Sequence, residues 1–304
     1  MPDPLPSINV VIPTLCAAER SAEIQRAIDS LRAQSGVSVR PIVVVNGERF
    51  DAVLRARLES DPFLRVHYVE RGSNGGAQRV GRQLVESEFF AFLDDDDELL
   101  PDTLALRVQP LLRDGSLAAV VANGLRSVRG QPEVPAVTLP VDLDQAAERI
   151  MGSNWLASCG GLFRSARVGT EYFDGVTDYF EWTLIAVRLL LAQVPMVFVD
   201  RPVFRIHETP RSLSRSSAYD AAWCVFLERL LRLPLTGGMR RRVAERLAVS
   251  YNTRSVVHLH QDELREAWHW HLRTLRSPGG WRYLPYTLRL GRAAAAALRP
   301  RARV

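Results

Sequence analysis

The strongest constraint on the fold is a repeated alternation of short apolar runs with amphipathic segments over the first hundred residues. Runs rich in Val, Ile and Phe, as expected of strands, lie at 8–12, 41–45, 65–69 and 89–93. Between them, apolar residues recur at helical spacing, as between Ala22 and Leu31. Strands that alternate with helices predict an α/β fold with a mostly parallel, Rossmann-like sheet and helices on both faces.

In sheets of this kind, ligands bind outside the carboxyl ends of the strands. Four pieces that are distant in sequence are expected at that edge: Pro13-Thr14, Asn46-Gly47, the loop 72–76, and Asp94 to Asp97. The sequence therefore predicts that the first hundred residues build one crevice.

Four consecutive carboxylates, Asp94 to Asp97, directly follow the apolar run 89–93. Like charges this close repel and raise one another's pKa, so a positive group is expected among them. Hard oxygen ligands without His or Cys nearby favour Mg²⁺ or Mn²⁺ over Zn²⁺. The alternative is an acidic loop that caps the helix beginning near Pro101, but capping needs one or two acids rather than four. The run predicts a metal site.

Composition narrows the class of protein. The chain has 304 residues, 47% of them hydrophobic, enough for a substantial core. Cys16, Cys159 and Cys224 are far apart and form no CxxC pair, which argues against a disulfide framework and a zinc site and fits a reducing compartment. No stretch approaches the roughly 20 apolar residues of a membrane span. We expect a cytoplasmic protein, with peripheral attachment to the inner face of the membrane as an option.

The last third of the chain has a different character. From Ala221 onward the pattern is helical, and no acidic residue follows Glu266. Eight arginines lie in that tail, and the formal charge of +5 less these eight leaves about −3 on the rest of the chain. The tail is interpreted either as basic amphipathic helices that lie on anionic lipid or as a helical cap with solvated arginines. It has no nucleic-acid-binding motif, so nucleic acid is not expected as a partner. We expect two domains, 1–215 and 216–304.

Five segments occur in an order that resembles family 2 glycosyltransferases of the GT-A fold. They read VVIPTL, VVVNGE, SNGGAQRVGRQL, FFAFLDDDDELLP and EYFDGVTDYFEWTLIAVRL. The resemblance covers about residues 7 to 215. It implies a metal-dependent, inverting enzyme that moves a sugar from a nucleoside diphosphate to a hydroxyl of a saccharide or lipid-linked acceptor, in surface polysaccharide or glycoconjugate synthesis. The alternative is a non-catalytic nucleotide-sugar-binding or scaffold protein on a degenerate GT-A domain.

The resemblance also implies roles for the aspartates and the first loop. Asp94 and Asp96 resemble the two acids of the DXD motif, with Asp96 expected to coordinate the Mn²⁺ or Mg²⁺ on the sugar-nucleotide diphosphate. Asp95 is expected to contact ribose or a metal-bound water. The loop Pro13-Thr14-Leu15 resembles the one that cradles the base.

Further donor contacts are implied at the neighbouring loops. Gly76 lies in the glycine-bearing loop, Arg79 is expected to contact pyrophosphate or ribose, and His207 resembles a late basic element near the diphosphate. Where the family commonly has an aspartate that recognises uracil, this chain has Val45 followed by Asn46. A neutral amide presents a different set of donors and acceptors. This departure leaves dTDP, CDP and GDP open, while UDP remains the first expectation.

The catalytic base is expected on the helix predicted after Phe173-Asp174-Gly175, because an attacking hydroxyl needs a carboxylate within reach. Two acids compete there. Glu181 is preferred over Asp178, because Glu181 precedes Trp182 in an arrangement similar to the family's ED-W-x-L-x-x-R. The alternative is that one or both are solvated acids or partners of a helical arginine. Trp155 is expected either on the acceptor side or in the core.

Overall fold

The computed structural model describes residues 4–128, 130–176, 179–208 and 217–297, with side chains from 222 onward in the last range. Its internal contacts divide the chain into two compact units, Met1–Ser212 and Leu213–Val304, which are described separately. The predicted boundary between 215 and 216 lies outside the described residues.

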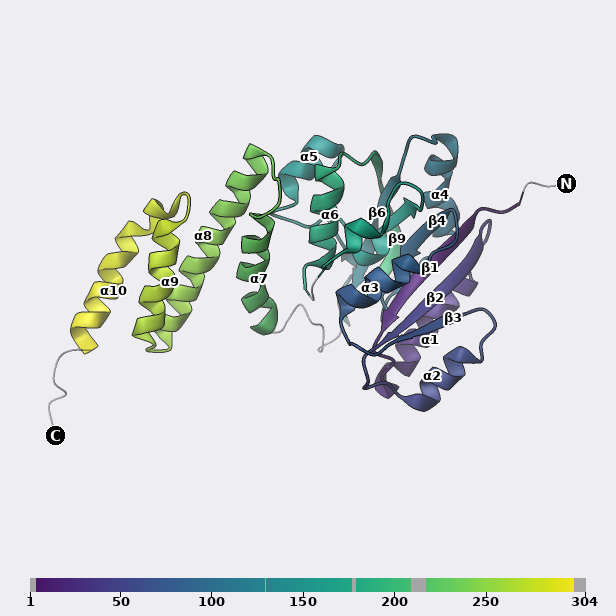
Figure 1. The fold of residues 1–304 in the computed structure, drawn as a ribbon, viewed down its shortest axis with the longest axis horizontal. Coiled ribbons are helices and arrows are strands. Elements are labelled where there is room, and N and C mark those ends of the chain that lie inside the picture. Colours follow the sequence, from purple (N-terminus) through teal and green to yellow (C-terminus); the bar gives the residue numbers. More distant parts are fainter. Residues whose placement is uncertain (1–3, 129, 177–178, 209–216, 298–304) are drawn as a thin grey trace. The chain divides into compact units, whose positions relative to one another are not determined.

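The first unit contains one mixed sheet with helices on both of its faces (Figure 1). Its strands are β1 (Ser7–Thr14), β2 (Ser38–Asn46), β3 (Arg65–Val69), β4 (Phe89–Phe92), β5 (Glu98–Leu99), β6 (Ala119–Ser127), β7 (Val134–Pro135), β8 (Gly161–Arg164) and β9 (Met196–His207). Its helices are α1 (Ser21–Arg32), α2 (Ala52–Glu59), α3 (Asn74–Gln83), α4 (Thr103–Arg113), α5 (Leu143–Arg149) and α6 (Glu181–Leu191), with 3-10 turns η1 (Ala18–Arg20), η2 (Ser158–Gly160) and η3 (Thr170–Phe173).

The strand order is β3-β2-β1-β4-β8-β6-β9-β5, with β7 paired to β6. From the pairing directions, β1, β2, β3, β4, β6 and β9 run one way, while β5, β7 and β8 run the other. The predicted α/β class with a mostly parallel sheet and helices on both faces is confirmed. The short β8 was not expected, and it enters antiparallel between β4 and β6.

Alternate side chains of β1 serve the two faces of the sheet, as the pleat requires. Ile8, Val10 and Ile12 belong to the main core with the apolar faces of α1, α2 and α4. Val11 points to the other face, where it packs closely against Gly81 of α3. On that face α6 adds an aromatic cluster, in which Trp182 lies 5.1 Å from Phe92 between ring centroids. The sheet is therefore buried on both sides, and its carboxyl edge is left for polar residues.

The second unit is helical, as expected for this region. It contains α7 (Ser217–Leu230), α8 (Gly237–His260), α9 (Leu264–Arg276), the 3-10 turn η5 (Gly280–Tyr283) and α10 (Leu284–Ala297). Consecutive helices pack on one another in chain order (Figure 1). Within the described residues, no helix combines the length and the hydropathy needed to cross a membrane.

Candidate active site

Hydrogen bonds link the four predicted pieces of the crevice in a chain. The Ser73 amide donates to Asn46 Oδ1 at 3.2 Å, and Asn46 Nδ2 donates to the Thr14 carbonyl at 3.0 Å. The Thr14 hydroxyl then donates to Asp95 Oδ2 at 2.6 Å. The ends of β1 and β2, the loop before α3 and the aspartate loop after β4 therefore meet at one edge of the sheet, as the strand-end argument predicts.

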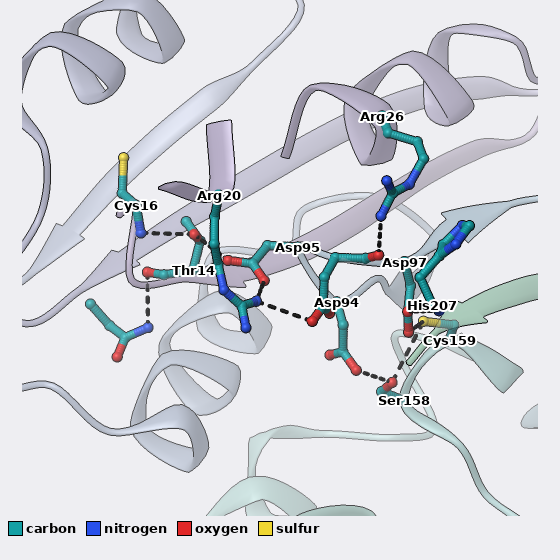
Figure 2. Close-up of polar contacts among 12 residues, drawn as sticks. Thr14, Cys16, Arg20, Arg26, Asp94, Asp95, Asp97, Ser158, Cys159 and His207 are labelled. Carbon is teal, nitrogen blue, oxygen red and sulfur yellow. Dashed lines mark hydrogen bonds and ion pairs between the residues drawn. The ribbon is translucent and has the colours of Figure 1, made fainter. Parts of the chain in front are cut away.

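A positive group does sit among the carboxylates, and it is an arginine that the sequence argument missed. Arg20, at the end of η1, pairs with Asp95 at 2.5 Å (Figure 2) and also with Asp96 at 3.2 Å. Arg26 of α1 donates to the Asp96 carbonyl at 2.5 Å. Repulsion in the run is thus partly relieved by the protein's own arginines.

Asp94 and Asp97 have a different environment from their neighbours. Asp94 accepts a 2.5 Å hydrogen bond from the Ser158 hydroxyl, and Asp97 accepts from the Cys159 thiol at 3.6 Å and from the His207 amide at 3.1 Å. Figure 2 shows both carboxylates turned toward η2. In the described part of the chain, neither carboxylate forms an ion pair with an arginine.

Burial raises the pKa of both groups. The pKa of Asp94 rises to about 7, through burial and the charges of Asp96, Asp95 and Glu181, against the Ser158 hydrogen bond. The pKa of Asp97 rises to about 8, through burial and the charges of Asp94 and Asp96. Both shifts mean that ionised Asp94 and Asp97 lack a compensating charge.

These two carboxylates fit a divalent cation. Ligand atoms of Asp94, Asp97 and Cys159 all lie within 4.8 Å of one another. Burial raises the pKa of the Cys159 thiol well above its ordinary value, so the thiol stays protonated and donates to Asp97. The ligands on offer are then carboxylate oxygens, which suit Mg²⁺ or Mn²⁺. Asp96, expected as the main metal ligand, is not in this group, and its carboxylate faces Arg20.

The Ser158–Cys159 segment is held from behind by a buried arginine. Arg107 of α4 is fully buried and donates to the Cys159 carbonyl at 2.8 Å. Burial lowers the pKa of its guanidinium to about 10. Arg107 thus fixes the backbone from which Ser158 and Cys159 reach the two aspartates.

Glu181 is the first residue of α6, which begins after Phe180 in a left-handed conformation with φ of 57°. Its Oε1 accepts a 3.0 Å hydrogen bond from Asn74 Nδ2 in the first turn of α3. The next residue, Trp182, is buried against Phe92 and fixes the start of the helix. The helix begins later than predicted, and Asp178 lies outside the described residues. Glu181 therefore contacts the start of α3, and it is close enough for its charge to act on the Asp94 carboxyl.

His207 lies at the end of β9, beside the aspartate loop. Its backbone amide donates to Asp97, and its Nε2 lies 3.3 Å from Glu98 Oε1. Glu98 also pairs with Arg205 at 2.5 Å. His207, the late basic residue singled out in the sequence, thus contacts the aspartate loop through its backbone amide.

The remaining predicted donor contacts differ in their surroundings. Both ends of the buried Asn46 amide are engaged within the chain, whereas Leu15 is 57% exposed at the mouth of the first loop. Arg79 is exposed and pairs with Asp174 at 2.5 Å.

In the glycine-bearing loop 72–76, the residue that another backbone segment approaches closely is Gly75 rather than Gly76. A Cβ on Gly75 would lie 2.3 Å from the Val176 carbonyl oxygen, while one on Gly76 would meet only the Ser73 side chain, at 3.4 Å or more. Gly76 instead donates its amide to the Ser73 hydroxyl, which caps α3. Pro13 is buried in β1.

Trp155 belongs to the core rather than to an acceptor surface. It is fully buried, its Nε1 donates to the Ala146 carbonyl at 3.0 Å, and its ring packs on Phe198.

Comparison with known proteins agrees with this fold. Residues 9–151 match the model of glycosyl transferase family 2. An uncharacterised glycosyltransferase of Rickettsia typhi is 23% identical over 243 residues, which cover 75% of this chain and 73% of the relative. The succinoglycan biosynthesis protein ExoO of Rhizobium meliloti is 30% identical over 154 residues, 47% of this chain and 43% of that protein.

Among solved structures, S. aureus TarS 1-349 in complex with UDP-GlcNAc superposes with a TM-score of 0.58 at 17% identity, covering 81% of this chain and 72% of that one. The same fragment without UDP-GlcNAc gives a TM-score of 0.55. The match to the family model over residues 9–151 and the glycosyltransferase relatives identify the chain as a glycosyltransferase. The likeness to the TarS structures shows that its fold is GT-A.

Proposed function

We propose that the chain transfers a sugar, with inversion, from a nucleoside diphosphate to a hydroxyl of a saccharide or lipid-linked acceptor, with Mn²⁺ or Mg²⁺ as cofactor. The observation that carries the proposal is that Glu181 lies beside the aspartate loop, and that hydrogen bonds through the loop 72–76 connect the two. Asn74, next to the Ser73 that contacts Asn46, holds Glu181 at 3.0 Å. The Glu181 charge in turn raises the pKa of Asp94.

Asp94 and Asp97, with Asp96 at their side, are the residues that would hold the cation. Bound there, a divalent ion supplies Lewis acidity that offsets the negative charge of a departing nucleoside diphosphate. The chain's own part is to hold the acids apart and oriented: Ser158 fixes Asp94, and Arg20 fixes Asp95 and Asp96. Leu15 gives the nucleobase an exposed apolar surface.

Glu181 is proposed as the general base. Its carboxylate would accept the proton of the attacking hydroxyl as the oxygen displaces the nucleotide from the opposite side, which gives inversion in one step. Asn74 and Trp182 orient it from two directions. Asp178, the second candidate, is left to the same mutational test.

The nucleotide proposed first is UDP, and residues 1–215 are proposed as the nucleotide-sugar-binding and catalytic domain. The crystallised TarS fragment binds UDP-GlcNAc, and ExoO is named for succinoglycan biosynthesis. The first supports a UDP-sugar donor, and the second supports an acceptor in surface polysaccharide or glycoconjugate synthesis. A cytoplasmic location, with peripheral contact at the inner face of the membrane, completes the proposal.

The test is a comparison of Glu181→Gln with the wild type in two assays, UDP binding with Mn²⁺ and release of UDP from a panel of UDP-sugars. We expect binding within about twofold of wild type and a turnover at least about 100-fold lower, the usual scale of a lost general base. Glu59→Gln, an exposed helical glutamate paired with Arg55, is the matched control and should change neither. A turnover of Glu181→Gln equal to a measurable wild-type turnover would refute Glu181 as the base. Intact UDP binding with no release of UDP by the wild type itself would favour a non-catalytic nucleotide-sugar-binding protein.

A further inference from the structure

The outer face of η5 and α10 exposes large apolar side chains in close succession. Trp281, Leu284 and Leu288 are 68%, 55% and 68% exposed. Leu284 and Leu288 are one helical turn apart and lie on the same side of α10. The inner side of the helix is anchored by Leu290, which is fully buried. The exposure therefore belongs to a packed helix with a defined outward face.

Exposed arginines border these apolar side chains. Arg282, Arg289 and Arg292 are all exposed, and no acidic residue lies between 267 and 297. Arg289 contacts His260 Nε2 at 3.1 Å, and Arg282 lies 5.8 Å from the centre of the Trp281 ring. Among the described residues, none of these arginines pairs with a carboxylate. Within the described part of the chain, no carboxylate neutralises the positive charge of this surface.

We propose that this surface, Trp281, Leu284 and Leu288 with Arg282, Arg289 and Arg292, binds an anionic lipid bilayer. It is called the α10 face below. An apolar strip beside basic side chains is what an interfacial helix needs: leucines and an indole enter the boundary between headgroups and acyl chains, and guanidinium groups bind lipid phosphates. Juxtamembrane basic residues each strengthen binding to acidic lipid.

The length and chemistry of the segment favour a lipid surface over other partners. A helix of 14 residues measures about 21 Å, short of the roughly 30 Å of a bilayer core, so α10 would lie in the interface rather than span it. A nucleic acid would use the arginines but leave the exposed leucines in water. The inference rests on the peripheral membrane contact of the proposed function and deepens it by naming the surface that makes the contact. Because these residues lie outside the aspartate site, a failure of this inference leaves the proposed sugar transfer untouched.

The experiment is sedimentation of the full chain with two kinds of vesicle, pure phosphatidylcholine and phosphatidylcholine with 30% phosphatidylglycerol. We expect binding to the anionic vesicles only, weakened at high salt because exposed charges are screened. Leu284→Ser/Leu288→Ser should lower the partition coefficient at least tenfold. Arg289→Gln/Arg292→Gln should lower it by about fivefold for each arginine.

The matched control is Leu112→Ser/Arg113→Gln, an exposed leucine and its neighbouring arginine on α4, which should bind like the wild type. Circular dichroism melting of every variant verifies that folding is intact, as expected for exposed side chains. Equal binding to both kinds of vesicle, no binding by the wild type, or unchanged binding of Leu284→Ser/Leu288→Ser would each overturn the proposal. None of these results depends on whether the chain transfers a sugar.

Discussion

Replacing Ser158 by alanine removes the hydroxyl that donates to Asp94 at 2.5 Å. That hydrogen bond favours the ionised carboxylate and opposes the effect of burial, which raises the Asp94 pKa to about 7. A hydrogen bond to a charged group is worth about 1.5–3 kcal/mol, which corresponds to about 1.1–2.2 pKa units. In the variant, the pKa of Asp94 is therefore expected at about 8 to 9.

The higher pKa weakens cation binding, because a proton and the divalent cation compete for the Asp94 carboxylate. At pH 7, protonation of Asp94 weakens Mn²⁺ binding about twofold in the wild type and about 14- to 160-fold in the variant. The apparent Kd for Mn²⁺ should therefore be about 7- to 80-fold higher in the variant. At pH 9 the same arithmetic leaves a difference of less than about threefold. The sign follows because an aspartate with a raised pKa gains its charge only as the pH rises through that pKa.

The assay is titration of Mn²⁺ into the protein with saturating UDP, at pH 7 and at pH 9. Ser165→Ala is the control, because the Ser165 hydroxyl donates to the Ser87 carbonyl rather than to the aspartate loop. A loss of affinity that is equal at both pH values would show that Ser158 does not act through the ionisation of Asp94. No loss at pH 7 would contradict the role given to this hydrogen bond.

Two further predictions concern the fold. Gly81→Ala should lower the free energy of unfolding by about 1–3 kcal/mol in urea, because its Cβ would lie 2.2 Å from Val11 Cγ1, and overpacking is costly. Gly76→Ala, in the same helix with only Ser73 nearby, should be neutral or stabilising, and equal effects of the two changes would refute the packing argument. All three cysteines are buried, and burial raises the pKa of Cys16 to about 11, so none should react with a thiol reagent at pH 7.5 until urea unfolds the chain. Rapid labelling of the native protein would contradict that burial.

Local patterns predicted the elements that rest on continuous apolar runs. The strand at 65–69 has the predicted bounds, and the run before the aspartates forms β4 as expected. The short β8 has four residues, and its pairing partners β4 and β6 lie far away in sequence. Because its position depends on tertiary pairing rather than on periodicity, the sequence offered no local signal for it.

The contacts of the candidate site also fall into two groups, those that the strand pattern predicts and those that depend on tertiary packing. That Thr14, Asn46 and the aspartates would meet followed from the rule that parallel strands end at one edge, and the structure joins them by hydrogen bonds. The Arg20 ion pairs and the Ser158 hydrogen bond depend on how η1 and η2 pack against the loop. The need for a positive charge near the acids was the only signal for Arg20, and it did not single out which arginine supplies that charge.

The most direct test of the central claim is isothermal titration of the purified protein with UDP, dTDP, CDP and GDP, each with Mn²⁺ and with EDTA. We expect that UDP binds with Mn²⁺ and that EDTA abolishes this binding. Asp94→Asn should weaken it strongly, while Asp114→Asn, on an exposed turn, should not. Nucleotide binding that is unchanged by EDTA and by Asp94→Asn, or binding of none of the four nucleotides, would contradict the central claim.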